Sequence, residues 1–464
     1  MQSRLAIAAA VGVVLAAGAA QAQTHTLQDA LAAAYANNPT LLAARAQTRA
    51  TDENVPAALA GWRPQVSVSA LGGPSRTTIV SPSPFGGNST QNAHQTETAE
   101  SLTVTQPIYT GGKTRASINR AENQVMSQRA TLMATENQVF SDTVSAYVTV
   151  IQDEQLLALD QSNEQLLTKE LQATNDRFRV GELTRTDVAQ AEAALASATA
   201  TRQTAEGTLQ TARATYEQLV GEPPGKLVDP QPLKLPVKSV DVGKAEAGRN
   251  NPNVVAALFA ESAAKDAFDV AYSALMPQLS VQGTLSHSVN QFAPNYTATA
   301  ETLLLNLQVP IYQGGTEYAA IRQARQQELQ ARQTLEVQRR TAVQQFTAAW
   351  TQVEASRAAI ASGRSAVRAG QIAVEGLERE ALVGSATTLD VLVAVQNLLN
   401  AQTALVQSLA QLITSSYQVA AAMGRLSARD LNLQVPLYDE KAYYNAVHDL
   451  WIGTGDFATS QPGR

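Results

Sequence analysis

Two carboxylates stand at matching places in the sequence and are the side chains best placed to do chemistry. Asp187 ends the stretch Thr184-Arg-Thr-Asp187, and Asp390 ends Thr387-Thr-Leu-Asp390. A Thr followed three residues later by an acid is a capping box, in which the acid serves the first turn of a helix. We favour this capping role for Asp187. For Asp390 it is one of two compatible roles that we keep.

Enzyme chemistry lacks a candidate set of residues. Gly112-Lys113-Thr114 is similar to the end of a phosphate-binding loop, but the required earlier glycine is replaced by Pro107. The sequence contains neither a Cys nucleophile nor a Gly-x-Ser-x-Gly elbow. The histidines lack metal-ligand spacing, being His25, His94, His287 and His448. We therefore expect no enzyme, no cofactor and no metal site.

Composition and charge exclude further classes of protein. The 464 residues carry a formal net charge of −6 and no Cys, which gives no footprint for nucleic acid and excludes disulfides. Residues 1–22 have a positive start, an apolar run and a small-x-small cleavage site, the pattern of a cleaved secretory signal. The run is shorter than the ~20 residues of a spanning helix, and no other stretch reaches that length. We therefore expect no membrane-spanning helix in the mature chain.

The sequence contains an internal repeat. QPIYTGG at 106–112 returns as VPIYQGG at 309–315, and the pairs Asn38-Pro39 and Asn251-Pro252 also correspond. The first half carries an extra stretch at 81–94, a loop by composition. These landmarks predict a signal at 1–22, a first repeat at 23–220, a Pro-rich linker at 221–240, a second repeat at 241–424, and a tail at 425–464 with a disordered end.

Each half predicts two strands followed by a long helical hairpin. Apolar and polar residues alternate near 64–72, 100–108, 277–286 and 301–310, and strands of this length can span an outer membrane when tilted. Helices at 113–180 and 316–383 would each be roughly 100 Å long. Shorter helices return at 184–220 and 387–423, so the hairpin tips fall near 181–187 and 384–390.

The long helices carry apolar residues at every seventh position, which favours a coiled coil over an ordinary bundle helix. One series contains Val125, Leu132 and Val139, and the other contains Phe346 and Val353. The fold class is therefore mostly α, with long coiled-coil rods and a small β part.

Four strands are too few to close a barrel in lipid, where unpaired backbone groups are not tolerated. Two copies of the chain would give eight strands and three copies twelve. The turns from strand to long helix hold tyrosines that we interpret as a membrane-surface belt rather than plain packing residues. These turns comprise Pro107, Tyr109, Gly111, Gly112, Pro310, Tyr312, Gly314 and Gly315.

The doubled plan resembles the TolC-like outer-membrane factors over nearly the whole mature chain. The matching stretches are TLQDALAAAYANNP, RPQVSVSA and MPQLSVQG, the paired PIYxGG turns, and the tips VGELTRTDV and VGSATTLDV. The resemblance implies a homotrimer with a twelve-stranded outer-membrane barrel and an α-helical tunnel across the periplasm of a Gram-negative bacterium. It also implies a duct without catalytic activity. The tail LYDEKAYYNAVHDLW resembles the type I secretion branch.

The resemblance also implies roles for the tips. They would dock onto a periplasmic adaptor (membrane fusion) protein that works with an inner-membrane ABC or RND-type pump. The docking residues would be Gly181, Glu182, Leu183, Thr184, Gly384, Ser385, Ala386 and Thr387. Asp390 and Asp187 would lie at the periplasmic entrance, where the family keeps acidic residues. In a trimer, Asp390 would supply three carboxylates, a ring that attracts cations and raises its own pKa by mutual repulsion.

This sequence departs from the family at three places. Val393 occupies the position of the family's second entrance acid, and Ala381 and Ala386 occupy the positions of the residues that latch the entrance closed. We therefore expect a single ring of acids at the entrance and a different set of latching residues. Our functional hypothesis is a passive exit duct for secreted proteins, small toxic compounds or both. The alternative is a periplasmic coiled-coil scaffold or adaptor without channel activity.

Overall fold

The computed structural model describes residues 24–235, 237–291, 295–455 and 457. The predicted secretory signal lies outside the described residues, as do 456 and 458–464 of the predicted disordered end. Contacts divide the chain into two compact units. The hairpin unit comprises the described part of Met1–Ala33 with Thr143–Gln231 and Gly363–Ala410. The sheet unit comprises Ala34–Asp142, Pro232–Ser362 and the described part of Gln411–Arg464.

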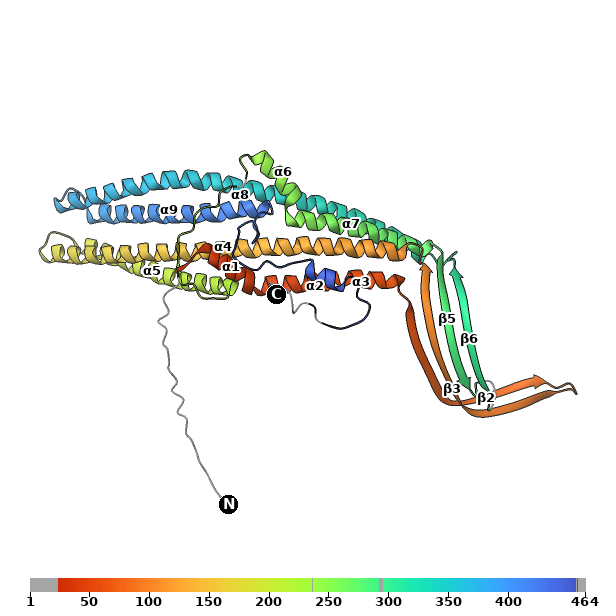
Figure 1. The fold of residues 1–464 in the computed structure, drawn as a ribbon. Coiled ribbons are helices and arrows are strands. Elements are labelled where there is room, and N and C mark those ends of the chain that lie inside the picture. The colour runs from red at the N-terminus through yellow and green to blue at the C-terminus, as the bar shows by residue number, and fades with distance from the viewer. Residues whose placement is uncertain (1–23, 236, 292–294, 456, 458–464) are drawn as a thin grey trace, which may run out of the picture. The chain divides into compact units, whose positions relative to one another are not determined.

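The sheet unit contains one antiparallel sheet in the order β2-β3-β5-β6 (Figure 1). Its strands are β2 (Gln65–Pro82), β3 (Asn88–Tyr109), β5 (Gln278–Val289) and β6 (Thr297–Gln308). Val66 pairs with Val104, which pairs with Gly283, which pairs with Leu303. Paired residues share a face of a sheet, so the apolar positions of all four strands gather on one side.

The first strand pair is longer than the alternation predicted. The loop expected at 81–94 is wrong, because β2 runs to Pro82 and β3 begins at Asn88. The turn between them is tight, with positive φ at Gly86 and Gly87. The missed part, such as Thr78 paired with Asn92, is mostly polar and places its apolar Ile79 and Val80 on opposite faces. It therefore carries no period-two hydrophobic signal, although its Thr residues suit a strand.

Short helices precede each strand pair. They are α1 (Leu27–Asn37), α2 (Pro39–Asp52) and α3 (Asn54–Leu59) in the first half, and α6 (Val240–Asn250) and α7 (Pro252–Tyr272) in the second. Asn38 caps α2 through bonds from the backbone N–H groups of Thr40 and Leu41, and Asn251 caps α7 through Asn253. A proline occupies the first turn of both helices, where its missing N–H costs nothing.

The long helices lie close to the predicted bounds: α4 spans Lys113–Arg179 and α8 spans Thr316–Leu382. The returning helices are α5 (Arg185–Val220) and α9 (Thr388–Ala422). The seven-residue series are buried stripes, since Val125, Val139, Phe346 and Val353 are all nearly inaccessible. This burial explains why the spacing is kept along such long helices.

One described helix, α9, is long and apolar enough to cross a membrane by length and composition. This differs from the expectation that the mature chain has no such stretch. That expectation counted unbroken apolar runs, whereas α9 intersperses uncharged Gln, Asn, Thr and Ser among its apolar residues. Only 17% of its most apolar window is buried within one chain, so α9 leaves apolar surface available.

The tail packs back onto the sheet unit. The Arg45 guanidinium lies over two rings, 4.4 Å from the centroid of Tyr35 and 5.4 Å from that of Tyr438. The helix α10 (Ala442–Val447) follows, and the hydroxyl of Tyr443 donates to Glu53 at 2.8 Å. In the hairpin unit, β1 (Thr24–His25) pairs in parallel with β4 (Lys226–Leu227).

Candidate functional site

The tip of each helical hairpin is closed by a glycine with positive φ. Gly181 has φ 84° and Gly384 has φ 77°. The N–H of Glu182 donates to Arg177 and that of Gly181 to Phe178, a Schellman motif. The same pair of bonds joins Ser385 to Glu380 and Gly384 to Ala381. A residue with a Cβ would be strained at either glycine, so the tip glycines have a conformational role at least.

Both tip carboxylates cap the returning helices. In the first tip, Asp187 accepts from the backbone N–H of Thr184 at 2.8 Å and from its hydroxyl at 2.7 Å. In the second, Asp390 accepts from Thr387 at 2.9 and 2.6 Å. Each Thr hydroxyl in turn accepts from the N–H of its acid, which completes the capping box. The capping role that we favoured for Asp187 therefore also holds for Asp390.

These hydrogen bonds lower the pKa of both carboxyls, the largest cause being the Thr184 hydroxyl for Asp187 and the Thr387 hydroxyl for Asp390. Both acids are therefore charged at neutral pH in the single chain. In an assembly, mutual repulsion would act in the opposite direction.

Further residues give the tips an exposed, partly apolar surface. Val180 is 72% exposed and Val383 is 79% exposed. Glu182, a predicted docking residue, forms an ion pair with Arg177 at 3.1 Å. Val393 is half-exposed on α9, while Ala381 packs against the apolar cluster that joins α8 to α9. The hydrogen bonds given above lie within each tip and hold its shape.

The strand-to-helix turns of the sheet unit also need glycine. Positive φ occurs at all four predicted glycines: Gly111, Gly112, Gly314 and Gly315. A Cβ on Gly111 would lie 2.7 Å from the Cβ of Met276, so this turn has no room for a side chain. The ring of Tyr109 is half-exposed and that of Tyr312 is 76% exposed. The proline of the first turn, Pro107, lies where the β3–β5 register shifts, and Pro310 follows β6.

One face of the sheet is apolar and exposed. Val68 is 76% exposed, Leu303 78% and Leu305 69%, although all three are large apolar side chains. A soluble monomer rarely leaves such a contiguous apolar patch in water. The face therefore fits contact with lipid.

The structure also shows where the histidines and two further acids lie. His287 and His94 lie exposed on β5 and β3 rather than together, and the described residues contain no group of three His, Cys, Asp or Glu that could hold a metal ion. Sequence reasoning missed two buried acids, Asp52 and Asp153. Nothing in their local sequence distinguishes them from surface acids on an amphipathic helix.

Comparison with known proteins decides the family. The model of the family described as "Outer membrane efflux protein" matches residues 30–222 and 245–425. The chain belongs to the outer membrane efflux protein family. It is 35% identical to the outer membrane efflux protein BepC of Brucella suis, covering 96% of each chain.

More distant members show the same relationship. Identity to the outer membrane protein TolC of Escherichia coli is 24%, covering 91% of this chain and 86% of TolC. Identity to the proteases secretion protein PrtF of Dickeya chrysanthemi is also 24%, covering 90% of this chain and 92% of PrtF. The structure superposes on the Campylobacter jejuni outer membrane channel CmeC with a TM-score of 0.76 at 18% identity, covering 86% and 85% of the two chains.

Family membership settles the general class of protein. The chain is an outer-membrane channel protein for efflux or secretion, with its helical tunnel in the periplasm, and it is not an enzyme. The TolC-like resemblance and the mostly helical fold with a small sheet are thereby confirmed.

Proposed function

We propose that this chain is one subunit of a homotrimeric duct, the passive exit of a tripartite export system. The exposed apolar face of the four-stranded sheet is the observation that carries this proposal. Lipid contact explains that face. A sheet in lipid also needs its edges paired, because hydrocarbon offers no hydrogen-bond partner to a free backbone group.

The sheet has two edge strands, β2 and β6, each paired on one side within the chain. Pairing β6 of one copy with β2 of the next would close the sheet into a barrel. Three copies give twelve strands, as the TolC resemblance implies. The apolar surface that α9 leaves exposed supports the same assembly, since neighbouring copies would cover part of it.

The internal repeat belongs to this proposal. The order of two short helices, two strands, one long helix and one returning helix is met twice along the chain, with α3 added in the first half. The family model also matches two separate segments. Two such halves at 23–220 and 241–424, joined through 221–240, would give each copy two hairpins for the tunnel wall.

We assign the docking of a periplasmic adaptor to the hairpin tips. The adaptor would connect the duct to an inner-membrane ABC or RND-type pump, and the pump would supply the energy. Support comes from the exposure of Glu182, Thr184, Gly384 and Thr387, and from the rigid Schellman turns beneath them. Asp390 would line the periplasmic entrance as a single acid ring, because the next turn carries Val393.

The cargo would be a secreted protein, small toxic compounds or both. The name of BepC refers to efflux and that of PrtF to protease secretion, so relatives of both kinds exist. Comparing the secreted proteins of the host with those of a strain lacking this gene separates the two. Loss of one or a few large proteins, restored by the gene in trans, identifies type I secretion. An unchanged secretome with increased drug accumulation identifies efflux.

Bilayer recording tests the duct itself. The purified chain should behave as three copies in detergent, remain with outer membranes after a carbonate wash, and conduct ions in a planar bilayer. The rival function, a periplasmic scaffold or adaptor, predicts release by carbonate and no conductance.

A further inference from the structure

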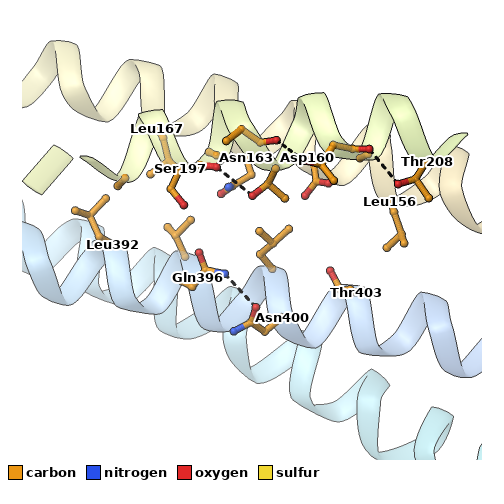
Figure 2. Close-up of a pocket in the computed structure, with 18 of the residues that line it drawn as sticks. Leu156, Asp160, Asn163, Leu167, Ser197, Thr208, Leu392, Gln396, Asn400 and Thr403 are labelled. Atoms are coloured by element: carbon orange, nitrogen blue, oxygen red, sulfur yellow. Dashed lines mark hydrogen bonds between the residues drawn. The ribbon is translucent and has the colours of Figure 1, made fainter. Parts of the chain in front are cut away.

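A cleft in the hairpin unit has the features of a small-molecule site. Its volume is about 690 Å³, and it lies between the α4–α5 hairpin and α9 (Figure 2). Apolar side chains line it on both sides, among them Leu156, Leu167, Leu392 and Leu399. About half of the lining residues are polar, among them Asp153, Asn163 and Gln396. Gln396 donates to Asn400 at 3.0 Å across one helical turn. A cleft of this size, which offers both apolar side chains and polar groups that can orient a ligand, suits a small molecule.

Asp153 on α4 is the unusual member of the lining. Its residue is only 6% exposed, and Oδ2 is buried without a hydrogen-bond partner. Burial raises the pKa of this carboxyl, and no partner lowers it again. A buried carboxylate without a donor is costly, so such groups in proteins are almost always paired.

Other acids of the same helix have the partners that Asp153 lacks. Glu164 forms an ion pair with Arg202 at 2.7 Å and accepts a hydrogen bond from the Thr199 hydroxyl at 2.7 Å. Glu154, the neighbour of Asp153, accepts from Arg213 at 2.8 Å. Arg202 and Arg213 of α5 are thus engaged by acids outside the cleft. The lining itself contains Asp153 and Asp160 but no Lys, Arg or His.

Asp160 extends the acidic stripe along the cleft. It follows Asp153 by two helical turns, so the two Cα atoms are roughly 10 Å apart at 1.5 Å per residue. Burial also raises the pKa of Asp160. Figure 2 shows Asp160 and Leu156 on the α4–α5 side of the cleft, opposite Gln396 and Leu392 of α9. The cleft therefore combines two acids at a fixed spacing with apolar walls.

We propose that this cleft binds an amphipathic organic cation. An ammonium group of the ligand donates to the carboxylate of Asp153, and its hydrocarbon body lies against the leucines. A second ammonium at the other end of an elongated ligand reaches Asp160. The ligand is held among helices of the hairpin unit of a single chain.

Calorimetric titration of the full chain in detergent tests the site. The probe is octamethylenediamine, an eight-carbon chain with an ammonium at each end, and neutral octanediol is the uncharged control. The diamine should bind and the diol should not. Asp153→Asn should weaken diamine binding by about tenfold or more, the loss of one charge-assisted hydrogen bond. This variant removes an unpaired buried charge, so its helical circular dichroism should be unchanged.

Asp176→Asn is the matched control. It removes the same charge from the same helix, but Asp176 is exposed and pairs with Arg179. Its affinity for the diamine should equal that of the wild type. A lack of binding to the wild type, or equal binding by wild type and Asp153→Asn, overturns the proposal.

A variant of Asp160 tests independently whether the ligand contacts both acids. Asp160→Asn should weaken binding of the diamine several-fold and leave binding of octylamine, which has one ammonium, unchanged. Equal weakening of both probes would contradict the two-ended arrangement. Equal binding of diol and diamine to the wild type would contradict the role of charge.

Discussion

The two helical hairpins have the same outline but are held together differently. In the first, α4 and α5 are joined by charged groups, with Arg202 bound to Glu164 and Arg213 bound to Glu154. In the second, α8 and α9 are joined by an apolar seam of Val374, Val391, Ala394 and Val395. The backbones approach closely there, since a Cβ on Gly370 would lie 3.2 Å from a methyl of Leu398.

Two hairpins with the same arrangement of helices can therefore differ in how their stability depends on salt. Salt does not screen apolar burial, whereas exposed and half-exposed ion pairs weaken as salt screens them. The first hairpin should therefore loosen with ionic strength while the second does not. Both share the same glycine tip and the same capping box, so the contrast lies in the seams and not in the turns.

The largest expected effect comes from placing a charge in the apolar seam. Val391 is 3% exposed, and Val391→Asp would bury an unpaired carboxylate between α8 and α9. We expect a loss of about 3–5 kcal/mol of stability and rapid protease cleavage of the second hairpin. Thermal unfolding and limited proteolysis in detergent measure both.

Val393→Asp is the control for that change. Val393 lies two residues further along α9 and is 50% exposed, so the same new carboxylate stays in water. Its stability should stay within about 0.5 kcal/mol of the wild type. Equal destabilisation by both variants would show that the seam of Val391 is not what holds the second hairpin together.

The next largest effect on stability comes from Asp52, a buried acid of the sheet unit, and this effect depends on pH. Asp52 is fully buried, and its nearest cation, Arg129, is 3.8 Å away without a hydrogen bond to it. Burial outweighs that attraction and raises the pKa of Asp52 to about 7. The folded chain therefore binds this proton more tightly than the unfolded chain, in which the pKa is near 3.8.

The sign of the pH effect follows from that difference. Between pH 3.8 and about 7 the folded state holds the proton and the unfolded state does not, so stability falls as pH rises through this window. At about 1.4 kcal/mol per pKa unit, the total is on the order of 4 kcal/mol. Asp52→Asn should abolish the fall, which chemical unfolding at several pH values measures. A variant whose stability still declined across the window would place the titrating group elsewhere.

Local patterns predicted much of this molecule because the physics behind them is local. The heptad stripes, which pass through Val139 on α4 and through Phe346 on α8, depend on a few neighbouring residues. So does the positive φ of Gly181. The extension of β2 to Pro82 was missed because its apolar residues Ile79 and Val80 are adjacent and do not alternate with polar ones. The isolation of Asp153 was missed for another reason: it depends on which α5 arginines are already engaged by Glu154 and Glu164. Contacts between distant segments leave no period in the sequence.

A smaller effect is expected in the charged seam. Glu164→Gln removes the carboxylate that Arg202 and Thr199 share, in a pair that is about one-quarter exposed. We expect a loss of about 1 kcal/mol at low salt and less at high salt. Hydrogen exchange of α5 amides at two ionic strengths measures it. A loss that did not change with salt would mean that packing, rather than charge, joins the first hairpin.

The tips, which are alike in both hairpins, give the smallest effect on stability. Thr184→Ala removes one capping hydroxyl and should cost about 1 kcal/mol, with a similar loss for Thr387→Ala, both measured by thermal unfolding. Unequal losses would mean that the two caps are not equivalent.

Charge at the entrance can be separated from capping by a second variant. Asp390→Asn keeps an oxygen that can accept the bonds of Thr387 but removes the negative charge. If Asp390 forms the entrance ring, Asp390→Asn weakens the block of bilayer conductance by trivalent cations, while Thr387→Ala leaves the block intact. If both variants leave the block unchanged, Asp390 is a helix cap only. If Asp187→Asn weakens the block as much as Asp390→Asn does, the first hairpin shares the entrance, and the two tips are alike in function as well as in shape.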